Sequence, residues 1–277
     1  MNELNETIAR KVLTTVDAGL VNGVGEPIPG KMCVEAAVCF ACGLPHSDNP
    51  PCVGAAVRRF KIRLNDSRWS SDAARTAGMR KLAIAQLGSD VISQQDFAKL
   101  VCEGTIRRIV PIPLRRAASK NPKHAESLEA MALRCENEGT IEVSRQARDL
   151  ALKVSKDAYA YAYAYAAAAA SAAADAASSA DAASSADAAA YAYAAAAADA
   201  AAAAAADAAA AAAADAAASA AADADADAAA SAAADADAAA RDQIFNICAD
   251  IGLQALITLE SPSCEYLYLT EEPNNGR

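Results

Sequence analysis

One segment of the sequence, residues 158 to 240, is built from only four residue types. Its 83 positions hold 59 Ala, 11 Asp, 7 Ser and 6 Tyr, with no Gly, Pro, Lys or Arg. Alanine has the strongest intrinsic preference for the α-helix, because its side chain loses no rotamer entropy when the helix forms. The ordered state that this composition favours is therefore helical, and the chain is predicted to be all-α.

A single straight helix over this alanine-rich tract would be too long for a compact domain. At 1.5 Å per residue it would extend about 125 Å. Ser and Asp favour helix caps, since they compete for backbone hydrogen bonds, and the candidate reversals are Ser178-Ser179, Ser184-Ser185 and Asp223–Asp227. We therefore expect a multi-helix bundle whose alanine-rich second half folds as antiparallel helices.

The first 150 residues show the apolar spacing of medium-length helices separated by Pro- and Gly-rich breaks. One such break, Pro111-Ile112-Pro113, is predicted to end a helix. A last amphipathic helix is predicted from Asp242, and Cys264–Leu269 has the alternation of an extended segment. The predicted helices of the first part are Glu3–Leu20, Lys31–Leu44, Val53–Leu64, Ser71–Leu87, Gln94–Ile109 and Ala125–Asn137.

These patterns predict three regions. They are a mixed helical domain (1–150), an alanine-rich helical bundle (151–260) and an extended C-terminal tail (261–277). Charge also divides the chain: residues 1–156 carry 23 Lys and Arg against 17 Asp and Glu, whereas residues 157–277 carry 2 against 18. A positive part and a negative part of one chain can pair with each other within a protomer or between protomers. Homo-oligomerisation is therefore expected. The alternative is that the acidic residues serve only to keep the alanine-rich helices soluble.

The cysteine content and the N-terminus predict a cytoplasmic protein. Eight irregularly spaced cysteines, without an apolar export signal at the N-terminus, are typical of reduced thiols. The alanine runs reach the length of a membrane span only by including Asp, which costs roughly 2.5–3.5 kcal/mol near the bilayer centre. No membrane association is expected.

The densest group of possible metal ligands comprises Cys39, Cys42, His46 and Cys52, which we call the Cys39–Cys52 cluster. Thiolates and an imidazole at such spacing can enclose a tetrahedral zinc ion. Two of the cysteines lie in an otherwise apolar helix, however, where cysteine packs as a small hydrophobic residue. Core packing is the favoured interpretation and zinc the alternative, and no cofactor is predicted.

Cys33 is the candidate nucleophile, because the dipole of the helix that it begins would lower its thiol pKa, with His124 as a distant base. Glu35 could be a buried acid, but a partly exposed carboxylate paired with Arg58 or Lys31 is more common. Two histidines in the whole chain disfavour common acid–base enzymes. No catalytic residue is predicted.

Basic side chains gather between residues 58 and 81. They could follow the phosphates of a nucleic acid, or face Asp residues of another copy or of the same chain. The candidate interaction residues, called here the candidate arginines, are Arg58, Arg59, Arg63, Arg75 and Arg80.

The segment from Gly30 to Asp90, with KMCVEAAVCFACGLPHSDNPPC at its start, resembles a family of uncharacterised bacterial and phage-associated proteins that also carry alanine-rich helical second halves. The alanine-rich part is similar in style to the helical immunity proteins of bacterial toxin systems. The resemblance implies a bacterial or phage setting and names no activity.

The function that we predict is that of a non-enzymatic protein-interaction or self-assembly protein of a bacterial or phage system. Its partner would be another protein or a second copy of the chain. The alternative is a nucleic-acid-associated protein that uses the basic N-terminal half. A cysteine-dependent hydrolase is third.

Overall fold

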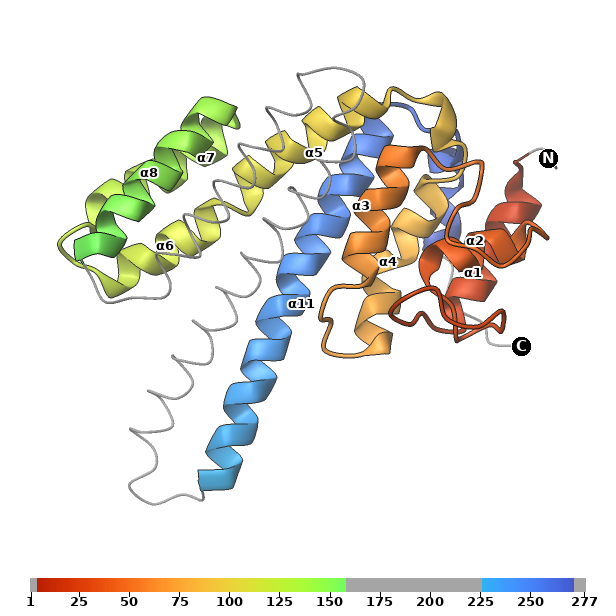
Figure 1. Cartoon of the computed structure of the whole chain (residues 1–277), viewed down its shortest axis with the longest axis horizontal. Helices are drawn as coiled ribbons and strands as arrows, with labels where there is room; N and C mark the ends of the chain where they lie inside the picture. Colours follow the sequence, from red (N-terminus) through yellow and green to blue (C-terminus); the bar gives the residue numbers. More distant parts are fainter. Residues whose placement is uncertain (1–3, 158–225, 272–277) are drawn as a thin grey trace. The chain divides into compact units, whose positions relative to one another are not determined.

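The computed structural model describes residues 4–157 and 226–271 (Figure 1). Residues 158–225, with the predicted reversals of the alanine-rich tract, lie outside them. In the described ranges the regular elements are helices, and β-structure is limited to isolated bridges between Leu20 and Met32 and between Gly25 and Met32. The all-α prediction is confirmed. No helix in these ranges is both long enough and apolar enough to span a membrane.

The described residues form two compact units. The first contains residues 4–101 and 249–271, and the second contains residues 102–157 and 226–248. Two helices, α5 and α11, contribute residues to both. The elements in chain order are α1 (Glu6–Asp17), α2 (Val34–Ala41), α3 (Ala55–Asn65), α4 (Asp72–Ala85), the 3-10 helix η1 (Ser89–Val91), α5 (Gln94–Arg108), α6 (Pro111–Lys120), α7 (Ala125–Glu138), α8 (Ile141–Asp157), α11 (Ala226–Thr258) and the 3-10 helix η2 (Pro262–Thr270).

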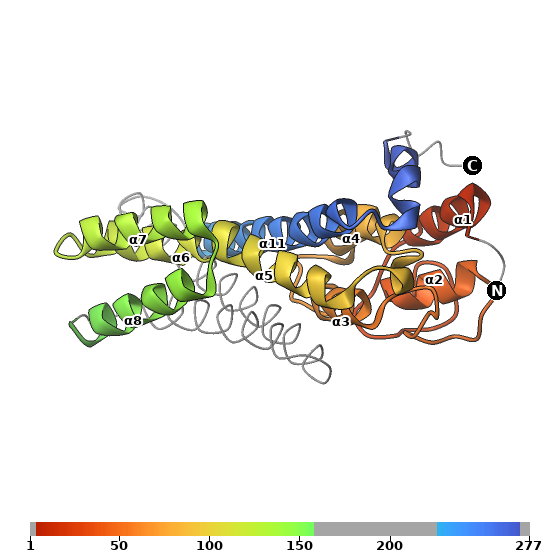
Figure 2. The same cartoon turned by 90° about the horizontal axis from the view of Figure 1, so that it is seen from above.

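The first unit is built around α2, a short helix whose residues from Val34 to Cys39 are all buried. α1 packs against α2 and α4, and η2 packs against α1 and α4; α1 and α2 lie side by side in both views (Figure 2). Gly252 of α11 lies close to the Phe60 ring of α3. A Cβ atom added at Gly252 would lie 2.4 Å from a ring carbon of Phe60. Phe60 in turn meets Phe97 edge-on, with ring centroids 6.0 Å apart. Close contacts between helices therefore fix the position of α3.

The second unit contains α6, α7 and α8, which pack in sequence order as neighbouring helices. Small and aliphatic side chains such as Leu114, Ala132 and Ala147 fill its core. The last carbonyl oxygens of α7 have no partner within the helix, and the Arg107 guanidinium supplies one. It donates hydrogen bonds to the carbonyl oxygens of Glu136, Asn137 and Glu138 at 2.6–3.0 Å. A cation at the carboxyl end of a helix also complements the helix dipole.

The six helices predicted before residue 138 are present, with ends a few residues from the expected positions. The Ser71 side chain caps α4 by accepting a hydrogen bond from the Ala74 N–H. Among the described residues α11 already includes Ala226, ahead of the expected Asp242, so the helical prediction for the alanine-rich tract is confirmed over 226–240. The division between the units falls after Val101, whereas composition places a boundary near residue 150.

Two local features differ from the predictions. α5 ends at Arg108, just before Pro111-Ile112-Pro113 as expected, but these prolines also begin α6, a helix that was not predicted. The first turn of a helix leaves its N–H groups without intrahelical partners and tolerates proline there. The predicted extended tail forms η2 over Pro262–Thr270. Its start is held by the Ser261 hydroxyl, which donates to the Ala85 carbonyl at 2.8 Å, and Leu269 is buried. The alternating pattern has no strand to pair with in the described ranges.

Candidate functional site

A small pocket lies where the beginning of α2 meets the end of α3. The Cys33 sulfur caps α2 by accepting a hydrogen bond from the Ala36 N–H at 3.4 Å. The Asn65 side chain of α3 accepts another from the Val34 N–H at 3.3 Å, and it donates to the Val21 carbonyl at 2.9 Å. These bonds join the loop before α2 to α2 and α3. Hydrogen bonds between side chains and backbone groups therefore fix the walls of the pocket.

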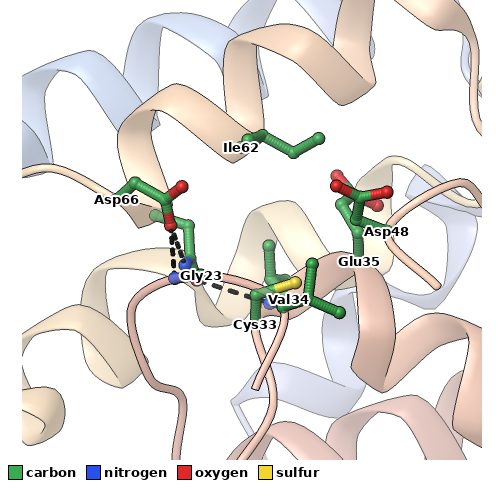
Figure 3. Close-up of a pocket in the computed structure, with 9 residues that line it drawn as sticks. Gly23, Cys33, Val34, Glu35, Asp48, Ile62 and Asp66 are labelled. Carbon is green, nitrogen blue, oxygen red and sulfur yellow. Dashed lines mark hydrogen bonds between the residues drawn. The ribbon is translucent and has the colours of Figure 1, made fainter. Parts of the chain in front are cut away.

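The pocket has a volume of about 60 Å³. Figure 3 shows the carboxylates of Glu35 and Asp48 together on one side and that of Asp66 on the other. Val34 and Ile62 supply apolar wall between them. Asp66 is oriented by hydrogen bonds that its Oδ1 accepts from the Gly23 N–H at 2.8 Å and from the Asn65 side chain at 2.9 Å. The site is thus a small cavity with three carboxylates around it.

Glu35 and Lys61 form a buried ion pair beside the pocket. Both side chains are 0% exposed, and Lys61 Nζ lies 3.5 Å from Glu35 Oε1. That distance is long for a hydrogen bond, and neither carboxylate oxygen nor the ammonium group has a hydrogen-bond partner. Unsatisfied groups of this kind are rare in protein interiors and are candidates for a functional role.

Burial controls the protonation of this pair. Loss of solvent raises the pKa of Glu35 from 4.5 to about 7, although the charges of Lys61 and Arg58 oppose the shift and Asp48 adds to it. Burial also lowers the pKa of Lys61, against the attraction of Glu35. Desolvation disfavours the charged form of each group. Glu35 therefore exchanges its proton near neutral pH, which an ordinary glutamate does not do.

The sequence-based interpretation of Glu35 as a partly exposed residue paired with Arg58 or Lys31 is wrong. Its ion-pair partner is Lys61, and Lys31 pairs with Glu26 at 3.5 Å on the surface. The sequence does contain a signal for a buried lysine. Val57, Phe60, Lys61 and Leu64 repeat at the three- and four-residue intervals of one buried helix face, and Lys61 occupies a core position in that pattern.

Cys33 is not set up as a nucleophile. Burial raises the pKa of its thiol, which outweighs the hydrogen bonds from the backbone of Ala36 and Glu35. The expected lowering of this pKa by the start of α2 is therefore wrong. The proposed base, His124, precedes α7 in the second unit.

The Cys39–Cys52 cluster separates into different environments. Cys39 is buried, and burial raises the pKa of its thiol to about 11. Interaction with the Cys52 thiol lowers the pKa of the half-buried Cys42 to about 7, whereas the exposed His46 ring places Nε2 3.0 Å from the Gly25 carbonyl oxygen. Within the described ranges, no three His, Cys, Asp or Glu side chains are grouped to hold a metal ion.

Two of the candidate arginines act within the first unit. Arg75 is buried, pairs with Asp72 and donates to the Asn65 carbonyl oxygen at 2.7 Å. Arg80 donates to both Asp17 oxygens at 2.7 and 3.0 Å, and to the Thr270 carbonyl. The other three lie on α3, where Arg59 and Arg63 are exposed and Arg58 is half-buried. Sequence spacing alone did not separate these two groups.

No protein-family model, curated protein or solved structure matches the chain.

Proposed function

We propose that this chain is a non-enzymatic protein-interaction protein whose first unit binds a lysine side chain of a partner protein in the acidic pocket. The observation that carries the proposal is the Glu35 carboxylate, which is fully buried at the pocket wall with no hydrogen bond to either oxygen. An ionised carboxylate only accepts hydrogen bonds. Lys61 supplies a positive charge beside Glu35 but lies 3.5 Å away without a hydrogen bond, so a hydrogen-bond donor from a ligand would supply what the carboxylate lacks.

The charges around the pocket favour a cation. Glu35, Asp48 and Asp66 line it, while Lys61 and Arg58 are the basic groups that act on Glu35. When all five groups are ionised, one negative charge is left over. The pair of Glu35 with Lys61 cancels locally, so Asp48 and Asp66 provide the attraction for a ligand.

The size and the walls of the pocket favour lysine over arginine. A volume of about 60 Å³ suits a compact ammonium group better than a planar guanidinium. Val34 and Ile62 give the methylene stem of a lysine an apolar surface to lie against, while its charged end reaches the carboxylates. A second copy of this chain, whose first 156 residues are rich in Lys and Arg, is one partner with this chemistry.

The probe that tests the proposal is n-butylammonium, which reproduces the lysine side chain. We expect its addition to the full chain to shift the amide resonances of Gly23 and Asp48 in a saturable way. Asp48→Asn should weaken this binding by about tenfold or more, because hydrogen bonds to charged groups contribute about 1.5–3 kcal/mol. Asp90→Asn, the same change at an exposed site outside the pocket, is the matched control and should bind like the parent.

Absence of saturable shifts at the pocket amides would refute the proposal. Equal weakening by Asp48→Asn and Asp90→Asn would also refute it, because the probe would then be responding to overall charge. n-Butanol has the same chain without the charge, and it should not bind.

Association with nucleic acid is the second candidate function. It would rest on the three arginines of α3, since Arg75 and Arg80 are engaged within the unit. Arg59→Glu should abolish DNA-dependent association if this candidate is right and leave binding of n-butylammonium unchanged.

The bacterial or phage setting implied by the resemblance is likewise a proposal, which the genomic neighbours would test.

A further inference from the structure

One exposed loop beside the acidic pocket consists mostly of apolar residues. Residues 24–29, which we call the rim loop, have the sequence Val-Gly-Glu-Pro-Ile-Pro, and all six are exposed. Val24 is 37% exposed and Ile28 is 47% exposed. Elsewhere among the described residues of the first unit, exposed large apolar side chains are separated, one on each of α2, η1, α11 and η2: Phe40, Val91, Ile257 and Tyr268. The rim loop therefore concentrates apolar surface where a loop is usually polar.

The backbone of the rim loop is fixed by its own hydrogen bonds. The Glu26 N–H donates to the Lys31 carbonyl at 2.7 Å, and the Lys31 N–H donates to the Ile28 carbonyl at 2.9 Å. Gly25 has a φ of +72°, and a Cβ atom there would lie 2.0 Å from the Lys31 carbonyl oxygen. A loop that is already ordered loses little conformational entropy when a partner covers it. Its apolar side chains are thus presented to solvent in a form suited to binding.

Val24 belongs both to the rim loop and to the wall of the pocket. Its carbonyl oxygen accepts a hydrogen bond from the Cys33 N–H at 3.3 Å. The preceding residue, Gly23, donates its N–H to Asp66 Oδ1 at 2.8 Å (Figure 3). The rim loop therefore starts at the pocket, and the groups next to a bound lysine would lie beside it.

We propose that the pocket and the rim loop form one binding surface for a protein segment in which a lysine is flanked by apolar side chains. The inference rests on the proposed binding of lysine in the pocket and adds the identity of its neighbours. The lysine enters the pocket, and an adjacent apolar side chain of the segment covers Val24 and Ile28. Burial of apolar surface at the rim loop then adds affinity to the charge recognition in the pocket.

The charges beside the rim loop favour a protein segment over a nucleic acid or a membrane. Asp48 and Asp66 line the pocket together with Val24, and the Glu26 carboxylate of the loop pairs with Lys31 at 3.5 Å. The phosphates of a nucleic acid or of lipid headgroups would meet the pocket carboxylates as like charges. A lysine with apolar neighbours offers a cation and apolar surface without a phosphate.

Three capped tripeptides test this surface on the full chain, with affinities measured from the amide shifts of Gly23 and Gly25. They are acetyl-Leu-Lys-Leu-amide, acetyl-Ser-Lys-Ser-amide and acetyl-Leu-Gln-Leu-amide. The Leu-Lys-Leu peptide should bind about tenfold or more tightly than the Ser-Lys-Ser peptide, because each methylene group removed from water strengthens association about fourfold. It should also bind about tenfold or more tightly than the Leu-Gln-Leu peptide, which brings no charge to the pocket.

Ile28→Thr separates this inference from the proposed function. Ile28 is outside the pocket lining, so the variant should bind n-butylammonium like the parent and the Leu-Lys-Leu peptide about fourfold or more weakly. Val24→Thr should also weaken binding of this peptide. Ile257→Thr, the same change at a side chain of α11 that is 40% exposed, is the matched control and should bind both probes like the parent.

Equal affinity of the native chain for the Leu-Lys-Leu peptide and either of the other two would overturn this inference, and binding of n-butylammonium would then leave the proposed function standing. Absence of n-butylammonium binding to the native chain would overturn both. Equal weakening of peptide binding by Ile28→Thr and Ile257→Thr would also count against the rim loop. Binding of the chain to phosphatidylcholine vesicles that Ile28→Thr abolishes would assign the rim loop to a membrane instead.

Discussion

Replacement of Glu35 by glutamine should change how the stability of the first unit depends on pH. The Glu35 side chain is 0% exposed, and burial raises its pKa from 4.5 to about 7. Between these values the folded state holds the proton and the unfolded state releases it. The free energy of unfolding therefore falls as pH rises through this window, and the contribution of Glu35 is lost above the folded pKa.

The size of this effect follows from the two pKa values. Proton linkage gives a loss of about 2.5 kcal/mol between pH 5 and pH 8 from Glu35 alone. Glu35→Gln removes the titrating group and so removes this loss. It also leaves Lys61 buried without its counter-charge, which lowers the pKa of Lys61 further and makes the stability of the variant rise with pH. Both effects act in the same direction, so the two profiles should diverge.

The single tryptophan of the chain provides the assay. Trp69 is buried in the first unit, and its indole N–H donates to the Leu64 carbonyl at 2.9 Å. Denaturant unfolding followed by Trp69 fluorescence at pH 5 and pH 8 therefore reports on this unit. Glu26→Gln, at a side chain that is 65% exposed, is the matched control and should follow the parent. Parallel profiles for the parent and Glu35→Gln would refute the assignment of Glu35 as a titrating buried acid.

Other predictions follow from the packing, the charges and the cysteines. Gly252→Ala should destabilise the first unit by about 1–3 kcal/mol, because the new Cβ atom overlaps the Phe60 ring, and adding Phe60→Leu should recover part of the loss in denaturant unfolding. Elemental analysis should find no stoichiometric zinc, since no three possible ligands are grouped in the described ranges and His46 Nε2 lies at the Gly25 carbonyl oxygen; one zinc per chain would contradict this. Light scattering should show a homo-oligomer that weakens as salt is raised, because exposed charge pairs are screened. A monomer at both low and high salt would leave the division of charge as a solubility feature alone.

The amino-acid sequence by itself determined the class of the fold. Apolar spacing and capping residues act within a few positions of the chain, so the helices before residue 138 could be predicted close to their observed ends. Ser71 is an example, since its hydroxyl needs only the N–H group three residues on. Predictions from neighbouring residues failed where contacts with distant parts of the chain decide the conformation of a segment. η2 is helical because Ser261 and Leu269 find partners in the first unit, and an alternating pattern cannot become a strand without a neighbouring strand.

The candidate site was decided by the tertiary structure. The spacing on α3 shows that Lys61 faces inward, but only the packing of α2 against α3 places Glu35 at 3.5 Å from it. Asp48 reaches the pocket from the loop between α2 and α3. Sequence periodicity says which face of a helix is buried, whereas the protonation and reactivity of a buried group depend on what lies opposite. That partner comes from another element of the chain, and its distance is set by the packing of the whole unit.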